Sequence, residues 1–481
     1  MSAPHVVVVG AGLAGLSAAL ACLDAGARVT LVERRRRLGG LTWSFEHDGH
    51  WVDNGQHVFL RCCTAYQNFL RRIGSDGDVE LQDRMDITVL RPGRGARRPR
   101  VARLRRTDLP APLHLGPALL GFRLLPLRDR LRLGLAAIPL RSMDLDDPSL
   151  DQQTFGAWLA SHGQSPTAIA YLWDLITIPT VNLPAGEASL AMGAKVFQTG
   201  LLTDSAAADI GWSRLPLGRL HGERAGAALA RAGATLVTGE RVKRIDPVDA
   251  EPGGSEPTAS PVDPGPCAGF AVRTEARTID ADAVVVAVPH DEAATVLPPG
   301  SFAQQFRVAE LGSSPIVDIH LRYDRRVTNL AMAAVVDSQA QFIFDRTAAS
   351  GLTAASGSSG PESQYLAVSV SAADGLVGRH PERVAQDVAT EIARVLPAAA
   401  DAKLTDTLVT KERNATWRAA PGTAALRPGP SSAYPGLAIA GAWTDTGWPA
   451  TMEGAVRSGL AAARACLAGT RHSRPLPKEV A

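Results

Sequence analysis

The residues from 10 to 15 read G-A-G-L-A-G, which matches the G-x-G-x-x-G turn that binds the pyrophosphate of a dinucleotide. Four valines typical of a buried strand precede the turn, and a Leu- and Ala-rich segment that is expected to be a helix follows it, from about residue 13 to 23. The first glycine of such a turn permits a tight bend, the second lets backbone amides approach phosphate, and the third allows close helix packing. The helix N-terminus adds positive potential.

Glu33 supplies the second part of this chemistry. It ends the next expected strand, Val29 to Glu33, 18 residues after Gly15. A carboxylate there accepts hydrogen bonds from ribose hydroxyls and repels a 2′-phosphate, so NADP is disfavoured. The chain therefore begins with a predicted βαβ unit. Residues 6–23 are uncharged, but glycines interrupt them and no positive segment precedes them, so neither a transmembrane helix nor a signal peptide is expected.

The composition is that of a globular protein with two or three domains: 481 residues, 45% hydrophobic and 20% charged. Fifty basic residues against 48 acidic ones give no basic excess, so no nucleic-acid partner is expected. The five cysteines contain no C-x-x-C pair. Neither a disulfide framework nor a metal site is therefore indicated, and a reducing cytoplasm is the expected compartment.

The segment after Glu33 favours a flavin over a nicotinamide dinucleotide. Residues 33–40 read E-R-R-R-R-L-G-G, which resembles the E-x-x-x-R-x-G-G element of the flavin amine oxidase and phytoene desaturase superfamily. The resemblance implies that Arg37 and the two glycines hold the loop around FAD. Arg34 and its neighbours have a simpler interpretation as a solvated cluster.

Two further segments resemble a narrower family. Residues 53–57 read D-N-G-Q-H, and residues 443–459 read W-T-D-T-G-W-P-A-T-M-E-G-A-V-R-S-G. Both are similar to the flavin elements of the hydroxysqualene dehydroxylases, which are FAD-dependent enzymes of hopanoid pathways. Segments 172–191 and 214–223 also resemble this family, so the similarity covers nearly the whole chain.

The resemblance implies a set of FAD contacts, and the binding is expected to be non-covalent because no cysteine lies where a flavin linkage would form. The expected cofactor-binding residues are Gly10, Ala11, Gly12, Leu13, Ala14, Gly15, Glu33, Arg34, Arg37, Gly40, Leu41, Gly55, Gln56, His57, Val242, Pro289, Gly441, Ala442, Met452, Glu453 and Val456. The chain departs from the family at Ala442, where an aspartate is usual. This change removes a hydrogen bond to FAD but also a negative charge near its diphosphate.

The reaction that the resemblance implies is reductive dehydroxylation of hydroxysqualene, an allylic alcohol, to squalene. It needs a hydride from flavin, an acid that helps hydroxide to leave as water, and a dry pocket for a C30 hydrocarbon. His57 is the first candidate for the acid or its relay, because histidine titrates near neutrality. Its alternative role is a hydrogen bond to flavin or backbone. Asp445 and Glu187 are second candidates, whereas Asp53 is expected to fix the loop.

Tryptophans are candidates for the pocket wall because aromatic faces stabilise a transient cation. Trp443 and Trp448 lie within the flavin motif and are expected at the pocket. Trp173 and Trp417 are also candidates, although a place in the hydrophobic core is the stronger interpretation for these two.

Residues 91–141 carry 13 arginines and two acids, interleaved with leucines. A basic, leucine-rich stretch suits peripheral contact with an anionic membrane, and a product as insoluble as squalene would give that contact a purpose. The alternative is a solvated helix packed on the substrate domain.

The predicted fold is α/β with two domains: a Rossmann-like FAD-binding domain and a substrate domain of mixed sheet and helices. The FAD-binding domain is predicted to be discontinuous, formed by residues 1–85, 218–300 and 425–481. The substrate domain is predicted at 86–217 and 301–424, mainly helical from 115 to 200, with a helical, membrane-facing part at 91–141. Two rival functions are a desaturase or amine oxidase of the same fold, and a flavin-free carrier of prenyl lipids.

Overall fold

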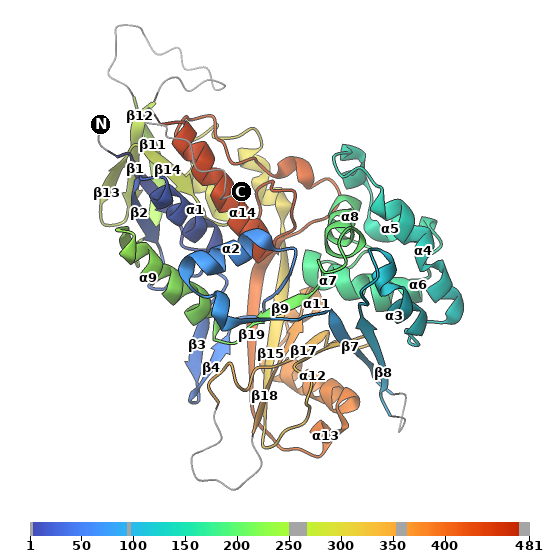
Figure 1. The fold of residues 1–481 in the computed structure, drawn as a ribbon. Coiled ribbons are helices and arrows are strands. Elements are labelled where there is room, and N and C mark those ends of the chain that lie inside the picture. Colours follow the sequence, from blue (N-terminus) through green and yellow to red (C-terminus); the bar gives the residue numbers. More distant parts are fainter. Residues whose placement is uncertain (1–2, 94–97, 250–266, 353–362, 471–481) are drawn as a thin grey trace.

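Valine-rich strands form the central parallel sheet in this computed structural model, which describes residues 3–93, 98–249, 267–352 and 363–470 (Figure 1). The five strands, in spatial order, are β10 (Thr235–Thr238), β2 (Arg28–Glu33), β1 (His5–Val9), β14 (Ala283–Val286) and β20 (Leu437–Ile439). All neighbouring pairs are parallel. Both faces are covered, which explains why the strands are continuously apolar rather than alternating. The strands predicted for the βαβ unit are confirmed.

Helices cover one face of this sheet. They are α1 (Leu13–Asp24), α2 (Thr64–Ile73), α9 (Arg224–Arg231) and α14 (Met452–Ala468). Helices α1 and α14 approach closely, because a Cβ on Gly459 would lie only 2.1 Å from the Ala14 carbonyl oxygen. The other face packs against a small antiparallel sheet and one helix: β11 (Val242–Asp249), β12 (Cys267–Thr274), β13 (Thr278–Ala281) and α10 (His290–Val296).

A second, seven-stranded sheet forms most of the other half of the molecule. Its strands, in spatial order, are β19 (Leu404–Trp417), β15 (Ser313–Tyr323), β18 (Gln364–Val370), β17 (Phe342–Asp345), β16 (Met332–Val335), β7 (Asp86–Arg91) and β8 (Arg100–Arg105). Only the β16–β7 pair in this sheet is parallel. Three helices pack against this sheet: α11 (Asp374–Val377), α12 (Pro381–Val395) and α13 (Pro397–Ala400).

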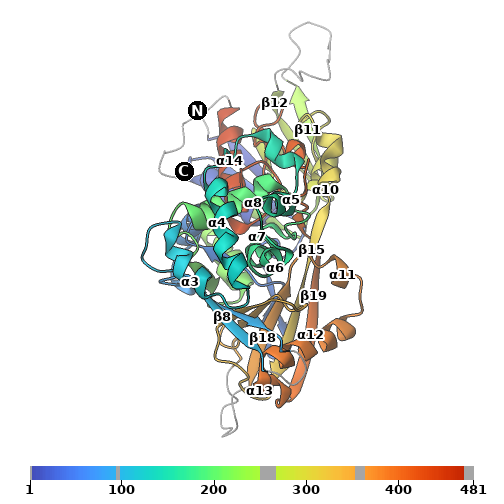
Figure 2. The same cartoon turned by 90° about the vertical axis from the view of Figure 1, so that its right-hand side faces the viewer.

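Six helices form a separate group beside this sheet (Figure 2). They are α3 (Gly116–Gly121), α4 (Leu127–Arg141), α5 (Phe155–Ser161), α6 (Pro166–Ala168), α7 (Asp174–Val181) and α8 (Leu190–Phe197). Short 3₁₀ or π-helical turns lie at Asp76–Asp78, Leu113–Leu115, Pro148–Gln152, Ile169–Trp173, Gln198–Leu202, Gly218–Glu223, Gln305–Leu311 and Ala424–Leu426. The prediction that residues 115–200 are mainly helical is confirmed.

The start of the arginine-rich segment 91–141 is not helical, which corrects the sequence-based expectation. Arg91 ends β7, and residues 100–105 form β8, whose sequence R-V-A-R-L-R buries Ala102 and Leu104 while the intervening side chains stay exposed. This alternation is the period of a strand with one buried face, and it overrides the leucine and arginine content. Residues 94–97 lie outside the described residues.

Two smaller sheets join the halves. A hairpin is formed by β3 (Ser44–His47) and β4 (His50–Asp53). The strands β5 (Val58–Leu60) and β6 (Val79–Leu81) both pair with β9 (Ile210–Ser213). The D-N-G-Q-H segment therefore runs from β4 to β5, between the two large sheets.

Candidate functional site

The glycine turn between β1 and α1 is tightly packed at two glycines and open at the third. Gly10 has a φ of +96°, and a Cβ on it would lie 2.4 Å from the Ala287 carbonyl oxygen. A Cβ on Gly15 would lie 1.9 Å from the carbonyl oxygen of Gly10. A Cβ on Gly12 would meet its nearest atom only at 4.0 Å, and Gly12 is the N-cap residue of α1 without a side-chain cap. The first turn of α1 therefore faces open space, as a pyrophosphate site requires.

Glu33 lies directly beside this turn at the end of β2. Its side chain is buried, with Oε2 accepting a hydrogen bond from the Ala11 amide and Oε1 accepting one from the Arg35 amide, both at 2.8 Å. Each carboxylate oxygen accepts more than one hydrogen bond, so the ribose hydroxyls can be bound as well. Glu33 thus orients the glycine turn at the place where a ribose acceptor is needed.

The loop after β2 folds back over the same turn. Gly40 has a φ of +58°, and a Cβ on it would lie 2.7 Å from the Cα of Gly12. The Arg37 guanidinium donates to the Gly40 carbonyl oxygen at 3.0 Å and lies 4.0 Å from the ring centre of Trp43. Burial lowers the pKa of Arg37 to about 10, so the side chain still carries a positive charge at neutral pH. This charge is available for a diphosphate.

Other residues expected at the cofactor differ in their surroundings. Arg34 forms a surface ion pair with Glu292. Leu41 is exposed, Val242 is buried at the start of β11, and Pro289 is the N-cap residue of α10. The Arg34 pair agrees with the simpler interpretation of that arginine as a surface residue.

The Asp53 carboxylate is held by three donors. The Ser44 hydroxyl donates at 2.6 Å, the Leu217 amide at 2.8 Å and the Arg346 guanidinium at 2.9 Å. Arg346 also donates to two backbone carbonyls, that of Ser213 at the end of β9 and that of Leu215 just after it. Asp53 and Arg346 are both buried. Together they fix the end of β4 against β9, which sets the position of the loop from Asn54 to His57.

Gln56 and Trp43 each carry a buried donor that the described residues leave unpaired, namely Gln56 Nε2 and Trp43 Nε1. Buried polar groups without a partner are rare in proteins. Both atoms lie on segments where the resemblance places FAD contacts, and the flavin ring is rich in acceptors. The residues present therefore fit the cofactor.

His57 is neutral in this environment. Its Nδ1 lies 3.2 Å from the Gly55 carbonyl oxygen, and because a carbonyl only accepts, Nδ1 must carry the hydrogen. Nε2 then remains as an acceptor. Burial lowers the pKa of His57, so the imidazole holds no extra proton at pH 7. The neutral ring can accept a proton and pass it on, but it does not hold that proton beforehand.

Asp318 is a functional candidate that sequence reasoning missed. It lies on β15, where one carboxylate oxygen accepts from the Gln56 amide at 3.2 Å. A Cβ on Gly55 would lie 3.2 Å from the other oxygen and 3.7 Å from His57 Cε1. Burial raises the pKa of Asp318 to about 7, with a smaller contribution from the Asp53 charge. The only sequence signal was one acid within the apolar run I-V-D-I-H-L.

A small pocket opens beside this loop, between β9 and β17. Its walls include Gln56, His57, Trp212, Leu217, Phe344 and Arg346. No sequence pattern distinguishes Trp212 or Phe344, because a single aromatic in a strand is usually a core residue. The pocket places two aromatic rings near the neutral His57.

The C-terminal motif surrounds the start of α14. Met452 and Val456 are buried, and the Glu453 carboxylate accepts from the Ala65 and Tyr66 amides at 3.2 and 2.7 Å. Glu453 thus caps α2 with its side chain. Upstream, Gly441 has a φ of +146°, and the Ala442 carbonyl oxygen accepts from Trp417 Nε1 at 3.1 Å.

The four candidate tryptophans lie in different surroundings. Trp443 and Trp417 are buried in the cluster that packs on the parallel sheet, and Trp173 is buried in the helical group, where its Nε1 donates to Gln164 at 3.1 Å. Trp448 is partly exposed. None of the four is among the residues that line the pocket at His57.

Asp445 and Glu187, the second-rank acids, both lie at the surface. Asp445 is 3.8 Å from Arg427, with 61% of its side chain exposed. Glu187 pairs with Arg418, with 53% exposed. The structure therefore does not bring these two carboxylates to the pocket at His57.

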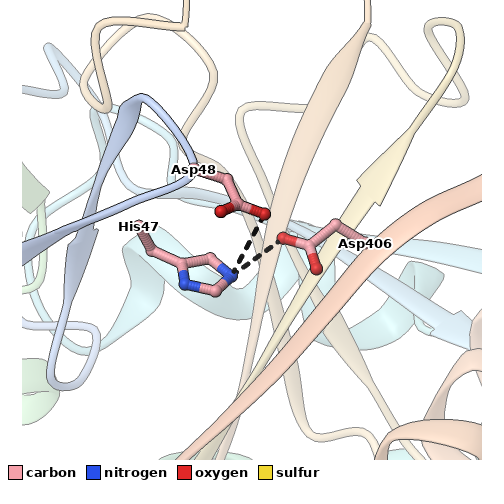
Figure 3. Close-up of side chains that lie close together, drawn as sticks. All are labelled: His47, Asp48 and Asp406. Atoms are coloured by element: carbon pink, nitrogen blue, oxygen red, sulfur yellow. Dashed lines mark hydrogen bonds and ion pairs between the residues drawn. The ribbon is translucent and has the colours of Figure 1, made fainter.

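A separate group of three side chains anchors the β3–β4 hairpin (Figure 3). His47 Nε2 lies 3.1 Å from Asp406 of β19 and 4.0 Å from Asp48 in the hairpin turn. The same ring nitrogen of His47 faces both carboxylates, and the three side chains are partly or largely exposed. The group ties the hairpin to the second sheet.

The fold and the glycine, Glu33 and Arg37 contacts are those of a dinucleotide-binding protein, and the family match identifies an oxidoreductase whose cofactor is FAD. The chain matches the family of flavin containing amine oxidoreductases over residues 13–467, and it belongs to this family. Membership in this family supports the interpretation that the protein is an enzyme and not a flavin-free carrier of prenyl lipids.

The individual relatives have more specific names than the family as a whole. The chain is 29% identical to a hydroxysqualene dehydroxylase of Rhodopseudomonas palustris, across 97% of this chain and 99% of the relative. It is 26% identical to a zeta-carotene desaturase of Synechocystis, across 96% and 97%. Among solved structures, putrescine oxidase bound to putrescine has a TM-score of 0.67 at 18% identity, across 97% of this chain and 99% of that one. This structural likeness shows the fold alone.

Among the described residues, no helix is both long and apolar enough to cross a membrane.

Proposed function

We propose that the protein reduces hydroxysqualene to squalene. FAD, when bound and reduced, supplies the hydride for the allylic carbon. Similarity to the hydroxysqualene dehydroxylases of Rhodopseudomonas palustris and Sinorhizobium fredii, at 29% and 27% identity over 97% of this chain, supports this reaction. The D-N-G-Q-H segment and the C-terminal motif are part of this similarity.

One observation favours dehydroxylation over oxidation of an amine or a polyene: the buried carboxyl of Asp318 has its pKa raised to about 7. Loss of hydroxide requires a proton from the enzyme, whereas amine oxidation and desaturation remove protons from the substrate. A carboxyl that is still partly protonated at neutral pH is the acid that dehydroxylation needs.

The chain's own residues then have defined roles. The Gln56 amide occupies one oxygen of Asp318, so the proton resides on the other oxygen, which approaches Gly55. Because glycine has no side chain, the carboxyl and His57 flank the same small space. Asp318 holds the proton, and neutral His57 passes it through Nε2 to the departing hydroxyl. Trp212 and Phe344 exclude water from the pocket and face the developing cation.

The proposed acid is tested with Asp318→Asn. Single-turnover reduction of hydroxysqualene under anaerobic conditions should slow by about 10² to 10⁴. Flavin content should stay unchanged, because asparagine keeps an oxygen for the Gln56 amide. Ser369→Ala, which removes the hydroxyl that also bonds to Asp318, is the matched control and should slow the reaction far less. An Asp318→Asn enzyme with the parent's single-turnover rate would exclude Asp318 as the acid.

The proposal also includes peripheral contact with an anionic membrane, through α3 and α4. Four residues on one side of α4 are strongly exposed: Leu127 at 58%, Leu131 at 66%, Leu135 at 57% and Ile138 at 70%. Their spacing of four, four and three residues places them on one helical face. Large apolar residues in such a row, next to exposed arginines, suit insertion among lipid headgroups.

The two sheets support the proposed division into domains. The strands of the parallel sheet lie within residues 1–85, 218–300 and 425–481. The strands of the seven-stranded sheet lie within 86–217 and 301–424. We assign flavin binding to the first set of ranges and the substrate to the second.

A further inference from the structure

A row of hydrogen bonds crosses three strands of the second sheet and ends at the loop after β4. The strands are β18, β15 and β19, which are neighbours in the sheet (Figure 1). His320 Nδ1 lies 2.7 Å from the Tyr365 hydroxyl, and His320 Nε2 lies 3.1 Å from the Thr410 hydroxyl. The Thr410 hydroxyl donates to the Asn54 carbonyl oxygen at 3.0 Å. Tyr365 and His320 are buried, and neither lines the pocket at His57.

The last member of the row fixes which groups donate. A carbonyl oxygen only accepts, so the single hydroxyl hydrogen of Thr410 goes to Asn54. The Thr410 oxygen must then accept from His320 Nε2. Burial lowers the pKa of His320 to about 3, so the ring is neutral and its Nδ1 accepts from the Tyr365 hydroxyl. Tyr365, His320 and Thr410 thus form a Tyr–His–Thr network with one direction, and hydrogen bonds aligned in this way strengthen one another.

The Asn54–Gly55 peptide carries this polarisation to the next amide. The Asn54 carbonyl points at Thr410 on β19, and in a trans peptide the following N–H points the opposite way. Gly55 is buried, and within the described residues its amide meets no acceptor. The Gln56 amide bonds to Asp318, which lies opposite Thr410 in the β15–β19 pair. The second sheet therefore holds the loop on both sides of Gly55, and a buried donor of this kind is a candidate contact for a ligand.

We propose that the Tyr–His–Thr network sets the reduction potential of bound FAD through the Gly55 amide, so that its three members are positioning residues. Gly55 is one of the residues that the resemblance places at the cofactor. A donor at the Asn54 oxygen draws electron density from the peptide, which makes the Gly55 N–H a stronger donor. Reduction increases the negative charge on the acceptor atoms of the flavin ring, so a stronger donor stabilises the reduced state more than the oxidised state. The network therefore raises the potential, whatever substrate the reduced flavin acts on.

The direction of the network is tested by NMR of the holoenzyme containing ¹⁵N-labelled histidine. The His320 signals are assigned by their loss in His320→Gln. Nε2 should carry the hydrogen and Nδ1 should not, without change over about pH 5 to 8, because burial lowers the pKa of His320 to about 3. A His320 ring that carries its hydrogen on Nδ1, or that titrates in this range, would overturn the proposal.

The effect on the flavin is tested by anaerobic reductive titration of the holoenzyme against a reference dye. Thr410→Val keeps the shape of the side chain but removes the hydroxyl. It should shift the equilibrium toward oxidised FAD by about threefold to tenfold, the net contribution of one hydrogen bond. For a two-electron couple this lowers the potential by about 15 to 30 mV. Tyr365→Phe removes only the far donor and leaves the contact with the loop in place, so it should act in the same direction by about twofold.

Two matched variants separate this effect from a general loss of structure. Thr410→Ser keeps the hydroxyl and should restore the parent's potential. Thr407→Val, at an exposed position of the same strand, should leave the potential unchanged. A Tyr365→Phe enzyme with the parent's potential would overturn the proposal even if Thr410→Val failed to fold. So would a potential in Thr410→Ser equal to that in Thr410→Val. These measurements need no hydroxysqualene and are independent of the proposed reaction.

Discussion

Replacing Arg346 with methionine removes the cation that neutralises the buried Asp53 carboxylate. Arg346 makes three hydrogen bonds, one to Asp53 and two to backbone carbonyls at and just after the end of β9. Removing one partner of a buried ion pair lowers the free energy of unfolding by about 3–5 kcal/mol, because the other charge stays buried without a partner. Asp53 keeps its Ser44 and Leu217 donors, so we expect the lower end, about 3 kcal/mol.

Urea unfolding of the holoenzyme, followed by tryptophan fluorescence, measures this cost. The double variant Arg346→Met/Asp53→Asn holds no unpaired charge. Its loss in free energy of unfolding should therefore be smaller than the sum of the losses in the two single variants, by at least about 1 kcal/mol. Arg325→Met removes a half-exposed arginine from its pair with Asp324 and serves as the control; it should cost under about 1 kcal/mol. A cost for Arg346→Met equal to that of the control would refute the idea that this pair fixes the loop.

Three further predictions follow from the same geometry. Gly12→Ala should leave the stability of the apoprotein unchanged but weaken FAD binding, because the added Cβ has room only while no ligand is present. Gly15→Ala should destabilise even the apoprotein, because its Cβ would clash with the Gly10 carbonyl oxygen. Calorimetry with and without FAD would show both effects. The rate of dehydroxylation should fall as pH rises through about 7, because Asp318 must be protonated, and this fall should vanish in Asp318→Asn. Changing Leu131 and Leu135 to serine should reduce co-sedimentation with anionic liposomes while leaving turnover of detergent-dispersed substrate intact.

The parts of the fold that the sequence predicted well depend on local patterns. The β1–α1–β2 unit follows from a valine run, a glycine turn and a helix of small residues, all within 33 residues. The glycine spacing also placed Glu33 correctly beside the turn. The prediction of a helix at 91–105 was wrong because it was based on the leucine and arginine content of the segment. The alternation of buried and exposed side chains in β8 is the pattern that indicates a strand.

The residues that sequence reasoning missed act through contacts between distant segments. Asp318 lies 262 positions from Gln56, and Arg346 lies 293 positions from Asp53. No spacing rule connects such pairs. The neutral state of His57 also depends on its burial in the folded protein. The histidine beside the D-x-G element therefore predicted a residue of the candidate site but not the acid that we propose.

We propose that the reduced enzyme delivers a hydride to an allylic alcohol. Anaerobically reduced holoenzyme is mixed with hydroxysqualene, and flavin absorbance and squalene are followed together in one turnover. One squalene should form for each flavin reoxidised. Reoxidation without squalene, or conversion of a polyene only by oxidised enzyme, would contradict it and favour a desaturase.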